Sequence, residues 1–220
     1  MEYIYILNDE ESTNVFNEIY HTNKFRFIPD PVPEIDITKC LNIRKDLNIP
    51  EEHKVYLHFG LMSERKGTLE ILKAIEISSK SELNDVTFIF AGILDKGIKD
   101  EFVSLQDRIR DRVNILVFDQ FCSYEFLFNL CFTCDVILMP YKLTSLSSGV
   151  IGYAAVFSKP VIGPSDGLIG NIIRKYNLGY CLPKITTAEI KKAFSTDIAV
   201  SENNYTRDNG LNGFINVILD

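Results

Sequence analysis

The sequence lacks a hydrophobic run long enough to span a membrane. Its most apolar stretch, residues 126–141, is interrupted by Asn129 and Asp135, whereas a spanning helix needs about 20 consecutive apolar residues. The first residues also lack a basic region and a cleavage-like site, which predicts that they are not a signal peptide. We therefore expect a cytoplasmic protein that is not transmembrane, with a peripheral position at the inner face of the membrane as an open alternative.

Positive charge is also scarce. The 220 residues contain 23 Lys and Arg against 30 Asp and Glu, for a formal net charge of −7. A nucleic-acid-binding protein needs a basic face for the phosphate backbone, so nucleic acid is not an expected partner. A hydrophobic content of 46% and a charged content of 24% are typical of a folded globular chain. A local basic site for a small anion remains compatible with this composition.

Cysteine is too sparse for a disulfide framework. The five cysteines are odd in number and scattered, which suits a reducing compartment. Cys131 and Cys134 form a C-x-x-C pattern, but no second pair and no nearby histidine complete the ligands of a structural zinc site. Because both lie on one apolar stripe of an expected helix, we interpret them as buried packing residues and expect no metal.

Short apolar runs alternate with amphipathic segments along most of the chain, as in parallel strands that are covered on both faces. The expected strands cover residues 3–7, 25–28, 54–59, 86–91, 113–117, 136–139, 160–162 and 180–182. The expected helices cover residues 12–20, 36–47, 68–78, 99–110, 123–134, 147–157, 168–176 and 188–194. This order predicts an α/β, Rossmann-like doubly wound parallel sheet. Ligands of such sheets bind beyond the carboxyl ends of the strands.

Prolines divide the chain near its start. Pro31 and Pro33 separate the first strand–helix–strand unit from the rest, because proline is unfavourable inside helices. That unit is too small to bury its own core, so we expect residues 1–30 to be a remnant or tail of a preceding domain. Residues 31–200 are expected to form the doubly wound domain. Residues 201–220 are rich in Asn and Gly, and we expect a peripheral segment with a final helix from Gly213 as one option.

The loop after the expected strand 54–59 is the most informative segment. The strand ends in Gly60, and a short polar loop leads through Arg65, Lys66 and Gly67 into a helix. Glycine permits a tight turn and the close approach of a ligand. The following helix start has free N–H groups and the positive end of the helix dipole, which favour anions. The loop therefore predicts a phosphate site, with a solvated surface charge pair as the alternative.

A second candidate anion site follows the expected strand 136–139. There Ser145-Leu146-Ser147-Ser148-Gly149 opens a helix on the same rim. Two helix starts that converge on one crevice, with Arg65 and Lys66 between them, predict a diphosphate site. An ordinary serine N-cap is the alternative reading of the turn.

Two polar residues within apolar segments are expected to be structural. His58 lies inside the strand before Gly60, where a hydrogen-bonded core histidine is the common outcome. Asp135 lies at the entry to a buried strand, and we interpret it as a cap or hydrogen-bond hub.

In their order and spacing these residues resemble the donor-binding, C-terminal domain of GT-B glycosyltransferases of the group 1 or family 4 type. The resemblance covers about residues 27–183. Its landmarks are Ile28-Pro29-Asp30, Phe59-Gly60, Arg65-Lys66-Gly67, Ile89-Phe90-Ala91-Gly92, the segment 134–140, Ser147-Ser148-Gly149 and Lys159-Pro160-Val161-Ile162.

The resemblance implies a set of donor-binding residues. It assigns Lys66, helped by Arg65 and by the loop at Gly60, to the donor diphosphate. The remaining implied positions are the diphosphate-binding helix start at Ser148, Gly149 and Val150, the nucleobase-side loop at Phe121 and Cys122, and the ribose-side position at Tyr153. It implies no cofactor and no metal, because protein cations stabilise the leaving nucleoside diphosphate.

The implied activity is transfer of a sugar from a nucleoside-diphosphate sugar to a glycan or lipid-linked acceptor in surface polysaccharide biosynthesis. A weaker interpretation is a flavodoxin-like or other nucleotide-binding domain. The chain lacks the acidic cluster and the glycine fingerprint of such sites, so this interpretation ranks last.

The chain departs from the family pattern in three ways. The family's two glutamates fall at Ser145 and Tyr153, and no Asp or Glu occurs between residues 136 and 165. Leu61 stands where an arginine is common. Most of an acceptor-binding N-terminal domain is absent from these residues, so no catalytic residue can be assigned. The alternative function is a non-catalytic nucleotide-sugar-binding or interaction subunit that needs an N-terminal-domain partner chain.

Overall fold

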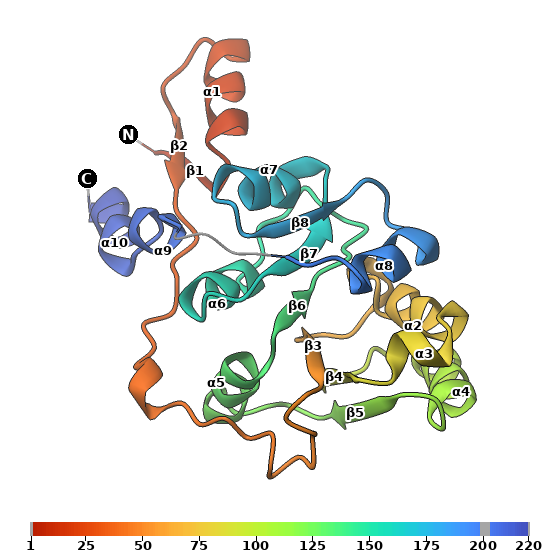
Figure 1. The fold of residues 1–220 in the computed structure, drawn as a ribbon. Coiled ribbons are helices and arrows are strands. Elements are labelled where there is room, and N and C mark those ends of the chain that lie inside the picture. Colours follow the sequence, from red (N-terminus) through yellow and green to blue (C-terminus); the bar gives the residue numbers. More distant parts are fainter. Residues whose placement is uncertain (1, 199–202, 220) are drawn as a thin grey trace.

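Six parallel strands form the main sheet of the protein, seen in a computed structural model that describes residues 2–198 and 203–219 (Figure 1). The strand order is β5-β4-β3-β6-β7-β8. Their bounds are β3 Lys54–Phe59, β4 Val86–Gly92, β5 Asn114–Asp119, β6 Val136–Leu138, β7 Val161–Pro164 and β8 Gly179–Leu182. Every adjacent pair of strands is parallel, which confirms the doubly wound α/β sheet.

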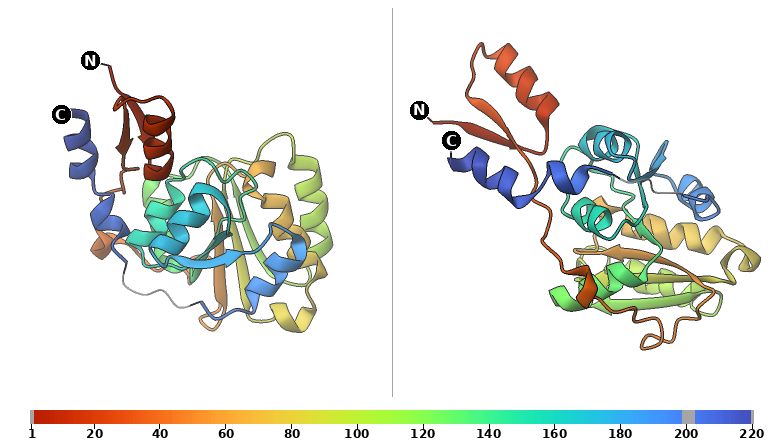
Figure 2. Two further views of the ribbon diagram at one scale, coloured as in Figure 1. Left: turned by 90° about the horizontal axis from the view of Figure 1, so that it is seen from above. Right: turned by 60° about the vertical axis from the view of Figure 1, so that its left-hand side comes forward.

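Helices cover both faces of this sheet. On one face lie α2 Thr68–Ile77, α3 Lys80–Leu83, α4 Lys99–Ile109 and α8 Thr187–Phe194. On the other face lie α5 Tyr124–Thr133, α6 Val150–Val156 and α7 Gly167–Lys175. The two views of Figure 2 show these layers on either side of the strands. None of the helices in the described residues is both long and apolar enough to cross a bilayer.

The central strand β3 shows why the sheet is buried. Val55 and Leu57 belong to the core under α5 and α6, and Tyr56 belongs to the core under α2 and α8. Side chains of a strand alternate between its faces, so a strand that packs helices on both sides must be apolar throughout. The continuous apolar run in the sequence therefore predicted the burial of this strand correctly.

The chain reverses its direction of travel across the sheet at β3. From β3 it proceeds outward to β4 and β5, and then returns to place β6 on the other side of β3. The loops after β3 and β6 thus leave the carboxyl edge of the sheet on either side of the switch in strand order, which is where sheets of this kind bind their ligands.

A second, smaller sheet stands apart from the first. Strands β1 Ile4–Leu7 and β2 Phe25–Ile28 pair in parallel, and helix α1 Glu10–Ile19 connects them. We call residues 2–28 the small lobe. Helices α9 Tyr205–Asp208 and α10 Leu211–Leu219 follow the main domain, and Figures 1 and 2 show α10 beside the small lobe. The expected domain boundary between residues 200 and 201 lies outside the described residues.

The small lobe is much less buried than the main sheet. Several apolar side chains of β1 and α1 face solvent, among them Leu7 at 44% exposure and Ile19 at 60%. Helix α10 has no buried residue, and Leu219 is 79% exposed. A two-stranded sheet is at best marginally stable by itself, so this lobe depends on the surface that it packs against.

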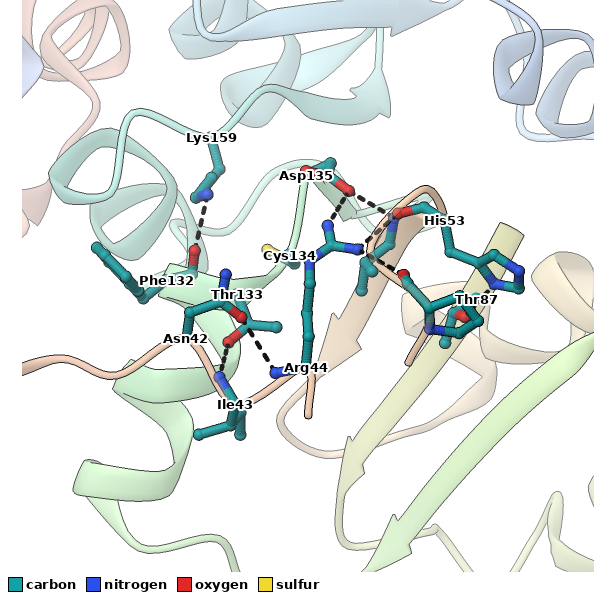
Figure 3. A network of polar contacts seen from close by, with 12 residues as sticks. Asn42, Ile43, Arg44, His53, Thr87, Phe132, Thr133, Cys134, Asp135 and Lys159 are labelled. Atoms are coloured by element: carbon teal, nitrogen blue, oxygen red, sulfur yellow. Dashed lines mark hydrogen bonds and ion pairs between the residues drawn. The ribbon is translucent and has the colours of Figure 1, made fainter. Parts of the chain in front are cut away.

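A polar network lies at the amino edge of the main sheet (Figure 3). The Arg44 guanidinium donates to the Asp135 carboxylate at 2.8 Å and to the carbonyl of His53 at 2.7 Å. The same carboxylate accepts the backbone N–H of Val55 at 2.7 Å. Asp135 is therefore a hydrogen-bond hub between β6, β3 and the segment before β3, as the sequence predicted.

The expected helix over residues 36–47 is wrong. The segment contains only a 3₁₀ turn, Ile37–Lys39, followed by loops and turns. Side chains of α5 bind its backbone: Asn129 accepts the N–H of Leu41 at 2.8 Å, and Thr133 accepts the N–H of Ile43 at 3.0 Å. These tertiary bonds satisfy the donors that a helix would use internally, so the apolar spacing of the segment was misleading.

The other predicted strands and helices are confirmed, with ends that differ by a few residues. The short helices α3 and α9 were not predicted, although Ser79 and Glu82 form a capping box that marks the start of α3. The final helix begins at Leu211, just before the expected start at Gly213. Cys131 and Cys134 are fully buried free thiols that pack under α5, which confirms the structural interpretation of the C-x-x-C pattern.

Candidate functional site

Two glycines shape the loop after β3. Gly60 has φ +94° and Gly67 has φ +70°, and both values are unfavourable for residues with a side chain. Between them, Glu64–Lys66 form a 3₁₀ turn that leads into α2. A Cβ atom at position 67 would lie 2.1 Å from the carbonyl oxygen of Pro140. The absent side chain therefore allows the loop after β3 to pack directly against the loop after β6.

Lys66 points inward from this turn. It is only 8% exposed, and its Nζ lies 3.5 Å from the carbonyl oxygen of Phe59 and 5.2 Å from the ring centroid of Tyr141. It has no carboxylate partner among the described residues. By contrast, Lys142 in the neighbouring loop contacts Glu70 at 2.7 Å and Glu64 at 3.5 Å.

Burial and a neighbouring cation both oppose the charge on Lys66. Burial is the larger cause and the Arg65 guanidinium the second, and together they lower the pKa of Lys66 to about 8. Near neutral pH the site thus holds a buried ammonium group whose charge is not neutralised by the protein. Arg65 itself is exposed and forms no ion pair within residues 2–198 and 203–219.

Tyr141 connects the two loops. Its ring is buried, and burial raises the pKa of its phenol to about 12, although a hydrogen bond with the Ser148 side chain and the charge of Arg65 lower it in part. The backbone N–H of Lys142 also donates to the carbonyl of Arg65 at 2.8 Å. The structure therefore places Lys66, Arg65 and Ser148 near one tyrosine, which the sequence analysis did not single out.

His58 lies beneath this group and is satisfied on both ring nitrogens. Nδ1 is 2.9 Å from the carbonyl oxygen of Leu138, which can only accept, so Nδ1 carries the proton. Nε2 then accepts from the Thr68 hydroxyl at 2.9 Å. Burial, reinforced by the charge of Lys66, lowers the pKa of His58 to about 4. It is therefore a neutral core histidine, as expected.

The turn before α6 differs from an ordinary serine cap. Gly149 occupies the N-cap position, and no side chain caps the helix. The hydroxyl of Ser147 instead donates to the Asp30 carboxylate at 2.6 Å. The alternative reading of this turn as a serine N-cap is therefore wrong. An added Cβ at Gly149 would meet nothing within 4 Å, so the space beside this turn is open.

The remaining predicted positions lie on other elements of the fold. Phe121 and Cys122 follow β5, two strands away from β3, and Phe121 is 80% exposed. Burial raises the pKa of the Cys122 thiol. The ring of Tyr153 packs against Phe59 and Phe128, with centroids 5.6 and 6.0 Å apart. Tyr153 is thus half-buried between α5 and α6, with its ring engaged by other aromatic side chains.

The sequence analysis missed Tyr141 and the partners of Ser147. A tyrosine directly after Met139-Pro140 is a signal that could have been used, because the residue after a buried strand often faces the rim. Asn8 and Asp30 had no such signal, since they are far from Ser147 in sequence. Within the part of the chain that the structure describes, no three His, Cys, Asp or Glu side chains gather as metal ligands.

No protein-family model matches the sequence, and no curated protein matches it. Solved structures match its fold. WaaG, a glycosyltransferase involved in lipopolysaccharide biosynthesis, is 17% identical with a TM-score of 0.66, over 86% of this chain and 51% of that one. HepE of Anabaena, solved with UDP and glucose, is 19% identical with a TM-score of 0.62, over 88% of this chain and 52% of that one.

A third structure matches as a separate domain. The C-terminal domain of LpcC, a glycosyl transferase group 1 family protein from Francisella tularensis, is 15% identical with a TM-score of 0.59. The match covers 98% of that domain and 85% of this chain. The present chain thus spans about half the length of WaaG and HepE and nearly all of the isolated LpcC domain. It has the fold of the C-terminal half of GT-B glycosyltransferases, as the sequence predicted.

Proposed function

We propose that the protein binds a nucleoside-diphosphate sugar through its diphosphate and acts as the donor domain of a glycosyltransferase. The observation that carries this proposal is the buried ammonium of Lys66, which has no carboxylate partner among the described residues. A buried charge is costly unless it is paired. A diphosphate bound beside the loop after β3 would supply the missing negative charge.

The neighbouring groups suit the same ligand. Arg65 would add a second cation, Gly60 would leave room for the phosphates, and the backbone amides at Ser148, Gly149 and Val150 would donate to phosphate oxygens. Cations at this position would stabilise the nucleoside diphosphate as it leaves the sugar. We propose a glycan or lipid-linked acceptor, a role in surface polysaccharide biosynthesis, and a reaction in the cytoplasm.

Two further positions complete the proposed donor site. The exposed ring of Phe121 and the adjacent Cys122 would contact the nucleobase, and Tyr153 would lie on the ribose side. Because Tyr153 is a phenol held by Phe59 and Phe128, it would hold the ribose by packing and a single hydroxyl rather than by a carboxylate.

Calorimetric titration with UDP and GDP tests the donor site. We expect one of the two to bind, and Lys66→Ala to weaken it by about 1–3 kcal/mol because a charge-assisted contact is lost. Lys45→Ala, which removes an exposed lysine at the opposite edge of the sheet, is the matched control and should leave the affinity unchanged. A folded wild-type protein that gives no heat with either nucleotide contradicts the proposal.

The titration also has a pH signature. Free Lys66 has a pKa lowered to about 8 by burial, and a bound diphosphate would raise it again. Binding near pH 8.5 should therefore take up protons, and the measured enthalpy should vary with the ionisation enthalpy of the buffer. Lys66→Ala should remove this proton uptake.

A second candidate function is a donor-binding subunit that is active only with a partner chain. The exposed apolar side chains of the small lobe favour it, because parallel strands are normally covered on both faces. In this proposal residues 1–30 are the remnant of an acceptor domain, residues 31–200 bind the donor, and residues 201–220 are peripheral. We expect the purified chain alone to transfer no sugar from UDP- or GDP-sugars; transfer by the chain alone would remove the need for a partner.

A further inference from the structure

One hydroxyl group ties the donor loop to the small lobe. Ser147, in the turn before α6, donates to the Asp30 carboxylate at 2.6 Å and accepts from the side-chain amide of Asn8 at 3.2 Å. Asn8 is the residue after β1, and Asp30 lies in the connection after β2. Ser147 is more than a hundred positions away in sequence from both Asn8 and Asp30, so only the tertiary fold brings the three residues together.

The network is anchored on the other side by α9. The Asn8 amide also donates to the phenol oxygen of Tyr205 at 3.1 Å, and both side chains are buried. The ring of Tyr205 packs edge-on against Tyr176 at the end of α7. The N–H of Val32 donates to the carbonyl of Asn209 at 2.9 Å, which fixes the connection after β2 to the same helix.

Asn8 is suited to this junction by its backbone as well. It has φ +60°, a conformation that asparagine tolerates better than most residues. Its N–H donates to the carbonyl of Ile28 at 2.7 Å, so its side chain is fixed relative to both strands of the small lobe. A movement of the lobe therefore displaces the amide that Ser147 accepts from.

The same serine turn belongs to the proposed donor site. Ser148 follows Ser147 directly, and its side chain is among the groups that lower the pKa of the Tyr141 phenol, whose ring lies beside Lys66. A displacement of Ser147 must displace Ser148 and Gly149, since they share one short backbone turn. The hydrogen bonds of Ser147 and this backbone turn thus join the orientation of the lobe to the shape of the diphosphate site.

We propose that Asn8 and Asp30 are positioning residues of the donor site, which act through Ser147 and couple nucleotide binding to the orientation of the small lobe. This inference rests on the proposed donor function. Coupling of this kind is reciprocal: if the lobe orientation changes nucleotide affinity, a bound nucleotide must also stabilise that orientation. Neither Asn8 nor Asp30 needs to touch the nucleotide.

Amide hydrogen exchange and nucleotide titration together test the coupling. The variants are Ser147→Ala, which removes the shared hydroxyl, and Asp30→Asn, which keeps the shape of the acceptor but removes its charge. Ser195→Ala, an exposed serine after α8, is the matched control. UDP and GDP are the probes, and exchange is followed in residues 3–8 and 145–150 with and without them.

We expect Ser147→Ala to speed exchange in both segments and to weaken nucleotide binding by about threefold to tenfold, as for the loss of one or two hydrogen bonds. In the wild type the nucleotide should slow exchange in residues 3–8, although the ligand does not contact them. Ser147→Ala should lose this remote protection, and Asp30→Asn should show an intermediate effect. The control should behave as the wild type.

Three results would overturn the inference. Unchanged exchange in ligand-free Ser147→Ala shows that the hydroxyl does not join the segments. Faster exchange with wild-type affinity and wild-type remote protection shows a structural bond without a positioning role, and leaves the donor function standing. A wild-type protein that binds neither nucleotide removes the donor function and the positioning role together, while the ligand-free exchange still reports on the network itself.

Discussion

Two buried cations lie at opposite ends of the main sheet, and they differ in the groups that neutralise their charge. Arg44, at the amino end of β3, is 7% exposed and contacts the Asp135 carboxylate and the His53 carbonyl. Lys66, at the carboxyl end, is 8% exposed; it lies 3.5 Å from the carbonyl of Phe59 and beside the Tyr141 ring, and has no carboxylate partner among the described residues. The degree of burial is nearly the same, so the difference between the two sites is the presence of a counter-ion.

This difference separates a structural charge from a binding charge. A buried cation that is paired with a carboxylate and hydrogen-bonded holds neighbouring segments in place, as Arg44 does for β3 and β6. A buried ammonium without a carboxylate lowers stability in the free protein, and that cost is offset only when an anion binds. Removing the buried cation should therefore lower the stability of the protein at the Arg44 end of the sheet and raise it at the Lys66 end.

The largest expected effect is at the paired end. Arg44→Met should destabilise the protein by about 3 kcal/mol, because the His53 carbonyl and the partly exposed Asp135 carboxylate lose a charged hydrogen-bond donor. Urea unfolding followed by circular dichroism measures the change. Arg44→Lys, which keeps the charge but not the forked geometry, should recover part of the loss. Stability unchanged in Arg44→Met would mean that the two cations do not differ as described.

A pH titration sharpens the comparison at the other end. His58 has a pKa lowered to about 4 in the folded state, against 6.5 for the ordinary side chain. The unfolded state therefore binds more protons between these values, and stability is full above pH 6.5 and falls as the pH drops through 4. The loss should reach at most about 3 kcal/mol. Urea unfolding of the wild type and of His58→Gln across this range measures it, and equal slopes for both would exclude His58 as the cause.

The smallest expected effect has the opposite sign. Lys66→Met should raise the stability of the ligand-free protein at pH 7 by about 1–2 kcal/mol, because an unpaired buried charge is removed. For the wild type, stability should increase as the pH rises from about 8 towards 10.5, since the unfolded state holds the proton longer. Thermal unfolding of both proteins at pH 7 and 10 tests this, and a less stable Lys66→Met at pH 7 would place Lys66 with Arg44 as a structural cation.

Much of the fold was predictable because local pattern and tertiary environment agree. The apolar runs at 54–59 and 86–91 form strands that are buried on both faces, and the pattern contained that information. Residues 36–47 show where the agreement fails: Asn129 and Thr133, about ninety residues away, bind the backbone and keep it out of a helix. Such long-range partners leave no local signal.

The sequence could place the candidate residues on the fold but could not give their electrostatics. Gly60 and the Arg65–Lys66 pair lie in the loop after β3, where the strand order switches, as the strand pattern predicted. Sequence alone could not separate the two cations, although the structure buries Lys66 and exposes Arg65. Nor could it show that Ser147 binds Asp30 instead of capping α6, because the choice depends on the position of the small lobe.

The unpaired edges of the two-stranded sheet are expected to make the association state of the protein depend on its concentration. Within the described residues β1 and β2 pair only with each other, so each has an outer edge of N–H and C=O groups that another strand can join. An association that grows with protein concentration is therefore expected, and sedimentation at several concentrations measures it.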